Sequence, residues 1–121
     1  MKKNTLIAIA GIYGFIGVAF GAFGAHALKD SLSPEMIEMF KTATYYNLIH
    51  TAVIFVIGIV GSEKYYKSGF ILSIGVFLFS FSLYAYAITD NALFAIITPF
   101  GGVSFLIGWI LIIWQSIKKK N

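Results

Sequence analysis

The sequence predicts an all-α integral membrane protein whose four transmembrane helices form a compact bundle. Hydrophobic residues make up 59% of its 121 residues and charged residues only 12%. Short polar breaks divide the chain into four apolar stretches, each close to the ~20 residues that a helix needs to cross the hydrocarbon core of a bilayer. Lipid offers no partner for backbone N–H and C=O groups, so such stretches cross as helices or as a closed barrel. Nearly uninterrupted apolar runs, such as 6–23, differ from the alternating pattern of barrel strands.

The breaks predict a single domain, 1–121, with spans at about 5–28, 43–60, 68–88 and 99–117. Segment 34–42 precedes the second span and is predicted to be the outer, amphipathic start of the same helix. Ser33 is typical of an N-cap, and Pro34 is typical of a first helical position.

Two interpretations are open for the residues before the fourth span. Thr98 and Pro99 repeat the pattern of a cap followed by proline. This favours a helix that starts at Pro99 and leaves 92–98 as a short apolar segment at the outer interface. The alternative is a single helix from Ala92 that is kinked at Pro99.

Seven of the nine lysines lie on one side of the predicted membrane. They precede the first span, connect the second to the third, and follow the fourth: Lys2, Lys3, Lys64, Lys67, Lys118, Lys119 and Lys120. Cytoplasmic loops retain Lys and Arg, so both termini are predicted to be cytoplasmic. The opposite side carries Lys29 and Lys41 among four carboxylates, and Tyr84 is expected in an aromatic belt there. The net charge of +4 therefore indicates topology, and we expect no nucleic-acid binding.

The chain shows no pattern that predicts catalysis. It has no cysteine, no HExxH motif and no paired carboxylates within a span, so we predict no catalytic residue, metal site or cofactor. The first span ends at Ala25-His26-Ala27, which is similar to the cleavage site of a secretory signal peptide. Its apolar run is longer than the ~7 to 15 residues of a signal core, and we expect it to be retained as a span.

The first span carries glycines along one side of its helix. At about 100° per residue, four of them fall within an arc of roughly 80°: Gly14, Gly17, Gly21 and Gly24. Gly17 and Gly21 have GxxxG spacing, which allows a second helix to approach closely. We interpret the four as a packing groove, for which the aromatic run 77–81 of the third span could supply the side chains; a homo-oligomer interface is the alternative. Gly101 and Gly102 are predicted to allow close packing of the fourth helix.

One face of the second predicted helix becomes polar only inside the membrane. It contains Met36, Phe40, Ala43, Asn47 and His50, which recur at spacings of four and three. Ionisable residues within spans suggest functional sites, and the candidate polar cluster consists of His26, Asn47, His50 and Asp90. Whether His26 and His50 meet is left open. We interpret His50 as a neutral, hydrogen-bonded core residue, because no ligand spacing around it suits a metal.

Several motifs together resemble a known family. They are GAFGAHAL at 21–28; Phe40, Ala43, Tyr46 and His50; FSFSLY at 79–84; TPFGG at 98–102; and Gly108-Trp109. On these residues the chain is identified as a member of the domain-of-unknown-function family 423, small bacterial membrane proteins similar to eukaryotic transmembrane protein 256. The resemblance implies a multi-pass protein of the bacterial plasma membrane with four helices and no assigned activity. Phe81 departs from it, since the resemblance leads us to expect glycine there.

Two classes of function remain. The first is a non-enzymatic membrane scaffold or accessory protein, in which the polar residues fix the packing of the helices. The second is a small transporter or channel with an outer-side polar cavity near His26, Asn47 and His50. Membrane lipids are the expected partners, with a homo-oligomer as a further candidate, and the sequence identifies no protein partner.

The distribution of lysines makes a prediction about topology. A reporter enzyme that is active only outside the cytoplasm, fused after Asn121, should give no signal, because the lysine-rich side is retained in the cytoplasm. The same reporter inserted after Asp30 should be active. A strong signal from the C-terminal fusion would contradict the predicted orientation.

Overall fold

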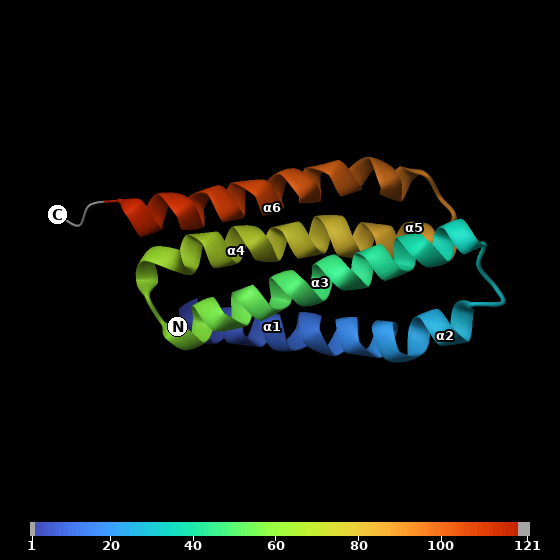
Figure 1. The fold of residues 1–121 in the computed structure, drawn as a ribbon, viewed down its shortest axis with the longest axis horizontal. Helices are drawn as coiled ribbons and strands as arrows, with labels where there is room; N and C mark the ends of the chain where they lie inside the picture. The colour runs from blue at the N-terminus through green and yellow to red at the C-terminus, as the bar shows by residue number, and fades with distance from the viewer. Residues whose placement is uncertain (1, 119–121) are drawn as a thin grey trace.

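The computed structural model describes residues 2–118 and is a bundle of long helices that lie side by side (Figure 1). Lys119 and Lys120, which belong to the predicted lysine run, lie outside the described residues. Four helical spans are long and apolar enough to cross a membrane: Lys2–Gly24, Pro34–Val60, Glu63–Thr89 and Leu93–Ile117. The predicted four-helix, all-α membrane class is therefore confirmed.

The first two spans form an antiparallel pair. The first consists of α1 (Lys2–Ala19), a π-helical segment η1 (Phe20–Gly24) and the short α2 (Ala25–Leu28). The second is the single helix α3 (Pro34–Val60). It begins where the Ser33 side chain accepts a hydrogen bond from the Met36 N–H at 3.2 Å. It ends at Gly61, whose φ of 73° lies in the left-handed region that favours glycine.

The third span also contains a π-helical segment. A 3-10 turn, η2 (Glu63–Tyr65), leads into α4 (Tyr66–Gly75), followed by the π segment η3 (Val76–Phe81) and then α5 (Ser82–Thr89). The span ends at Asp90, whose φ of 54° is one that short polar residues tolerate. The Asp90 N–H donates to the Tyr86 carbonyl at 2.7 Å.

The fourth span begins earlier than the favoured interpretation of the sequence. Helix α6 runs over Leu93–Ile117 and contains Pro99, so 92–98 is not a separate interfacial segment. The helix is started by Asn91, whose side-chain oxygen accepts from the Leu93 N–H at 3.0 Å. The Thr98 hydroxyl lies 2.6 Å from the Ser82 hydroxyl of α5, so it joins two spans instead of capping a helix. Neighbouring helices make a proline acceptable inside such a span.

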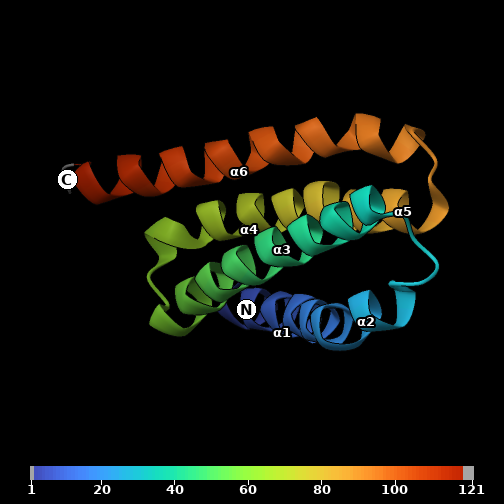
Figure 2. The same ribbon diagram turned by 45° about the vertical axis from the view of Figure 1, so that its right-hand side comes forward.

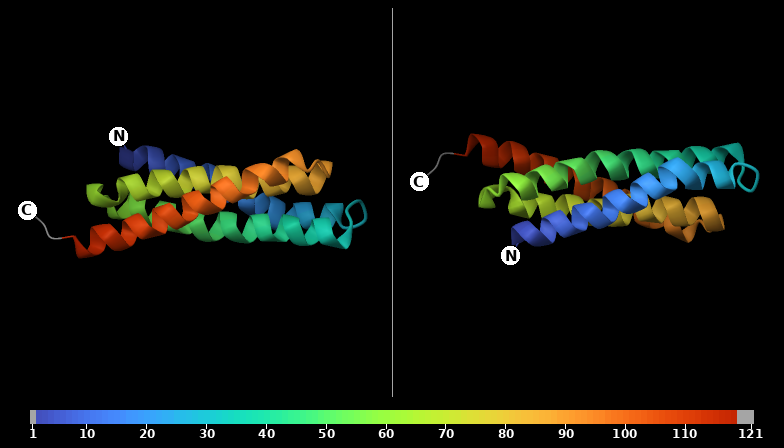
Figure 3. Two further views of the ribbon diagram at one scale, coloured as in Figure 1. Left: turned by 90° about the horizontal axis from the view of Figure 1, so that it is seen from above. Right: turned by 90° about the horizontal axis from the view of Figure 1, so that it is seen from below.

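The second and third spans form the centre of the bundle. Half of the third span is buried, against 17% for each of the first and fourth. The helices follow the order α1, α3, α4 with α5, and α6 across the bundle in two views (Figures 1 and 2). Views from above and below show α6 across one side of the central pair and α1 across the other (Figure 3). The first and fourth spans therefore present most of their surface to lipid.

Charged residues gather at the two ends of the bundle. The start of α1, the end of α6 and the connection between α3 and α4 lie at one end (Figure 1), and the described lysines of that end are Lys2, Lys3, Lys64, Lys67 and Lys118. The connections that follow α2 and α5 lie at the other end. There, Lys41 pairs with Glu38 at 3.8 Å on an exposed turn of α3. The separation matches the lysine pattern of the sequence, and the orientation in the cell remains a prediction.

The glycines of the first span face α3, not the third span. A Cβ atom at Gly17 would lie 2.6 Å from the Leu48 side chain, and one at Gly21 would lie 3.0 Å from the side chain of Thr44. Gly24 and Gly14 face Phe40 and Thr51 in the same way, at 2.8 Å and 3.5 Å. The side chains that fill the groove thus come from α3, the next span along the chain. The aromatic run 77–81 does not enter this groove, since Phe77 is 58% exposed and Phe81 packs on Tyr13 of α1.

The two glycines of the fourth span differ in their surroundings, which gives a prediction. A Cβ at Gly101 would collide with the backbone of Leu78 and Phe79, whereas one at Gly102 would make ordinary contact with the Phe79 ring at 3.9 Å. We expect Gly101→Ala to destabilise the protein by ~1–3 kcal/mol, because backbone atoms of η3 would have to move. Gly102→Ala should be neutral or stabilising by up to ~1 kcal/mol, since alanine favours helix. The free energy of unfolding in mixed micelles can be measured for both variants. Equal changes in Gly101→Ala and Gly102→Ala would contradict this packing.

Candidate functional site

The buried polar side chains of the centre of α3 form the candidate site. Asn47, His50 and Thr51 are 0%, 6% and 7% exposed, although they belong to an apolar span. The face that carries them is continuous with the fully buried Phe40 and Ala43. This face points toward the other spans because α3 has a neighbour on each side. A polar group at this depth has to find its partners within the protein.

Asn47 lies in the middle of a chain of hydrogen bonds. The Thr51 hydroxyl donates to the Asn47 Oδ1 at 2.9 Å, and the Asn47 Nδ2 donates to the Tyr84 hydroxyl at 3.2 Å. Tyr84 donates in turn to the Thr44 hydroxyl at 3.1 Å, and Thr44 donates to the Phe40 carbonyl at 3.2 Å. Each hydroxyl in the middle of the chain both accepts and donates. The chain joins α3 to α5 and ends on a backbone oxygen.

His50 has a hydrogen-bond partner at each ring nitrogen. The Trp109 indole N–H of α6 lies 3.0 Å from His50 Nε2, and His50 Nδ1 lies 2.8 Å from the Tyr46 carbonyl. An indole N–H can only donate, so Nε2 is the acceptor. A carbonyl can only accept, so Nδ1 carries the proton. The geometry therefore assigns a neutral imidazole that leaves neither nitrogen available to a ligand.

Aromatic rings hold the imidazole from its sides. The His50 ring stacks on Phe105 of α6 with centroids 3.8 Å apart and planes at 13°. The Phe105 ring occupies the place of a side chain at Gly75 of α4, so it can lie between the two spans. The Tyr46 ring packs on Phe79 at 4.6 Å. The rings that contact His50 thus come from its own helix and from α6, and Phe79 of the third span packs against two of them.

The candidate cluster predicted from the sequence does not form as one group. Asn47 and His50 lie on the same buried face of α3, but His26 is exposed on α2 and Asp90 is exposed after α5. His26 follows the π segment η1, which changes the register of a straight helix and places it at the end of the bundle. Within 2–118, no group of three His, Cys, Asp or Glu residues could hold a metal ion.

The residues of other helices that bond to Asn47 and His50 were not identified from the sequence. Tyr84 was expected in an aromatic belt, but it is 4% exposed and connects α5 to α3. Trp109 was part of one motif that carries the family resemblance, but no role for its side chain was evident from the sequence. Thr51 and Thr44 stand four residues after and three residues before Asn47, a spacing that could have indicated them.

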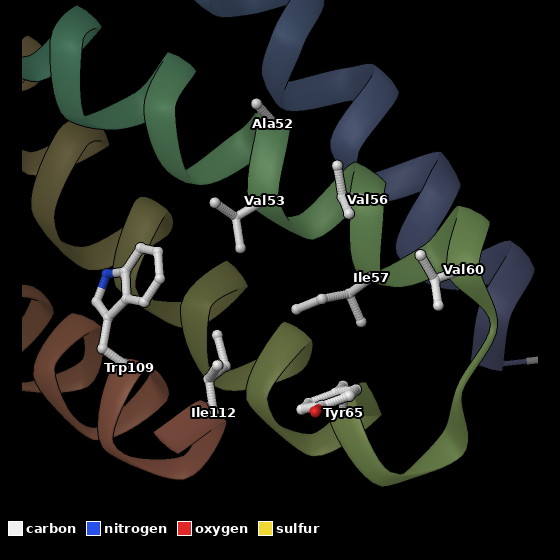
Figure 4. A pocket seen from close by; sticks show the side chains of 8 residues that line it. All are labelled: Ala52, Val53, Val56, Ile57, Val60, Tyr65, Trp109 and Ile112. Carbon is white, nitrogen blue, oxygen red and sulfur yellow. The ribbon is translucent and has the colours of Figure 1, made fainter. Parts of the chain in front are cut away.

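A groove in the described surface lies beside the site. It has a volume of about 410 Å³ and runs between α3 and α6 (Figure 4). Eight residues line it, namely Ala52, Val53, Val56, Ile57, Val60, Tyr65, Trp109 and Ile112. Trp109 belongs to both regions, since its ring lines the groove and its N–H bonds to His50. Neither Asn47 nor His50 lines the groove.

Comparisons with known proteins agree with the architecture. Residues 20–102 match the model of a family described as "Protein of unknown function (DUF423)". The UPF0382 inner membrane protein YgdD of Escherichia coli (strain K12) is 37% identical over 125 residues, which cover 100% of this chain and 95% of the relative. The UPF0382 membrane protein YwdK of Bacillus subtilis (strain 168) is 32% identical over 120 residues, which cover 95% of this chain and 98% of the relative. No solved structure matches the chain.

The hydrogen-bond chain through Tyr84 leads to a prediction. Tyr84→Phe should lower the stability by ~0.6 kcal/mol or more, up to ~1.7 kcal/mol, the average and the maximum for hydrogen bonds between membrane helices, because Asn47 and Thr44 lose their shared partner. Tyr45→Phe removes the same hydroxyl from a ring that is 63% exposed and should change the stability little. Unfolding in mixed micelles compares the two variants. Equal losses would show that the Tyr84 hydroxyl is not a structural bridge.

Proposed function

Because the chain belongs to the DUF423 family, whose description assigns no activity, we propose a function from its geometry: a non-enzymatic scaffold or accessory protein of the bacterial plasma membrane. In this proposal the buried polar groups fix how the helices pack, and the lipid-facing surface performs the function. Both termini are placed in the cytoplasm, following the lysine distribution.

One observation carries this proposal, namely that the buried polar residues of α3 bind one another and their neighbours. Asn47 is engaged through both its oxygen and its nitrogen, and both nitrogens of His50 are engaged. A general acid, base or nucleophile must reach the substrate with a proton or a lone pair. Groups committed to internal hydrogen bonds are arranged for structure, which argues against catalysis.

The same arrangement argues against the second function class, a transporter or channel. A path for a polar solute would bring water and unpaired polar groups to the middle of the bundle. The groove nearest to His50 is apolar, and Trp109 separates it from the imidazole. His26 and Asp90, which would extend such a path outward, are exposed at the end of the bundle.

A scaffold needs an accessible binding surface, and the outer helices provide one. On α1, Phe15 is 77% exposed and Ile12 is 60% exposed; on α6, Leu106 and Ile110 are 64% and 62% exposed. Apolar surface on this scale is normal for a membrane protein because lipid covers it. It is also the surface that a helix of a partner or of a second copy would contact.

Cysteine labelling tests whether the site is dry. The chain has no cysteine of its own, so single cysteines report one position each. In proteoliposomes with a water-soluble maleimide on both sides, we expect Thr51→Cys to react at least about tenfold more slowly than His26→Cys, because a thiol in apolar surroundings stays protonated. Comparable rates would place water beside Asn47 and make the transporter the better proposal.

A further inference from the structure

We propose that the groove between α3 and α6 binds one acyl chain of an anionic phospholipid, with Lys64 at its mouth contacting the phosphate. The groove begins at Trp109, beside the buried site, and continues along α3 to Val60, next to the lysine-rich end of the bundle (Figure 4). The site therefore lies in the leaflet at that end.

The walls of the groove suit a hydrocarbon chain. Apart from the Tyr65 hydroxyl and the Trp109 indole nitrogen, the side chains that line it are purely hydrocarbon. From Ala52 to Val60 the rise of α3 is roughly 12 Å, close to the depth of one leaflet in a core of ~30 Å. An acyl chain in this groove would thus run in the same direction as its neighbours in the bilayer.

The shape of the groove suits a single hydrocarbon chain. It holds about 410 Å³ along roughly 12 Å of α3, and its walls come from two helices. An acyl chain can follow such a groove while its headgroup stays at the lysine-rich end. A helix of a second copy is the competing occupant, and the experiment below separates it from lipid.

The charge at the mouth suits an anionic headgroup. The Lys64 Nζ lies 5.2 Å from the centroid of the Tyr65 ring, and Tyr65 lines the groove. Within the described residues, no carboxylate lies within ion-pair distance of Lys64. Glu63, the acidic residue of the same connection, lines a separate groove with Lys2 and Lys67. Lys64 is therefore available to a phosphate at the point where an acyl chain would leave the protein.

Native mass spectrometry can test the site with dioleoyl phosphatidylglycerol and dioleoyl phosphatidylcholine as probes. The purified protein should retain one phosphatidylglycerol, with about a fivefold preference over phosphatidylcholine, as expected for one lysine near an anionic headgroup. Val56→Trp should abolish the retention by filling the groove. Val18→Trp is the matched control, because Val56 and Val18 are 56% and 58% exposed and only Val56 lines the groove.

Two further variants complete the test. Lys64→Gln should remove the preference for phosphatidylglycerol and keep the binding of lipid, whereas Lys67→Gln should leave both unchanged. If Val56→Trp fails to fold, Ile112→Trp fills the groove from the opposite wall. Equal loss in Val56→Trp and Val18→Trp, or no retained lipid in the parent, would overturn the proposal. So would a dimer of the parent that only the groove variants dissociate, since it would place a second copy there.

Discussion

The bilayer core holds no water, and the rest of this structure depends on that constraint. A polar side chain at mid-membrane depth must be satisfied by the protein itself. The sequence places Asn47, His50 and Thr51 there. Asn47 and His50 bond to Tyr84 and Trp109 of two other spans, and Thr51 bonds to Asn47 of the same helix. Tyr84 and Trp109 reach α3 from α5 and α6, so each hydrogen bond also fixes the position of a helix. Apolar packing alone would hold these helices less specifically, since lipid tails are as apolar as leucine.

The hydrogen bonds depend on close packing elsewhere. A Cβ atom at Gly17 would lie 3.0 Å from the Asn47 Nδ2, so a larger residue in α1 would displace the amide from Tyr84. In the same way, Gly75 makes room for Phe105, which stacks on His50. Small residues on one helix thus set the geometry of polar residues on another. The close packing of the helices and the hydrogen bonds of their polar side chains therefore depend on each other.

The sequence predicted the architecture well because lengths and charges determine it. Four apolar stretches and a biased distribution of lysines are enough to give four spans, and the Ser33 cap was recognisable because capping is local. The favoured start of the fourth helix at Pro99 was wrong because the Asn91 side chain accepts from the Leu93 N–H and Thr98 bonds to Ser82 of the third span. The alternative, a single helix from Ala92 that contains Pro99, agrees with α6. The position of His26 was predicted for a continuous α-helix, but the π-helical segment η1 precedes it and changes the register of the helix. The partners Tyr84 and Trp109 lie 37 and 59 residues from Asn47 and His50, beyond any local pattern.

The groove between α3 and α6 also follows from the absence of water in the bilayer core. Because the Trp109 N–H is directed at His50, its ring is held at one end of the space between α3 and α6. Toward the lysine-rich end, α3 presents the short side chains of Val56 and Val60, and the space stays open. In water, an open apolar surface of this kind would favour association or collapse. In a bilayer, hydrocarbon can fill it without exposing a polar group, which is the arrangement that we propose for the acyl chain.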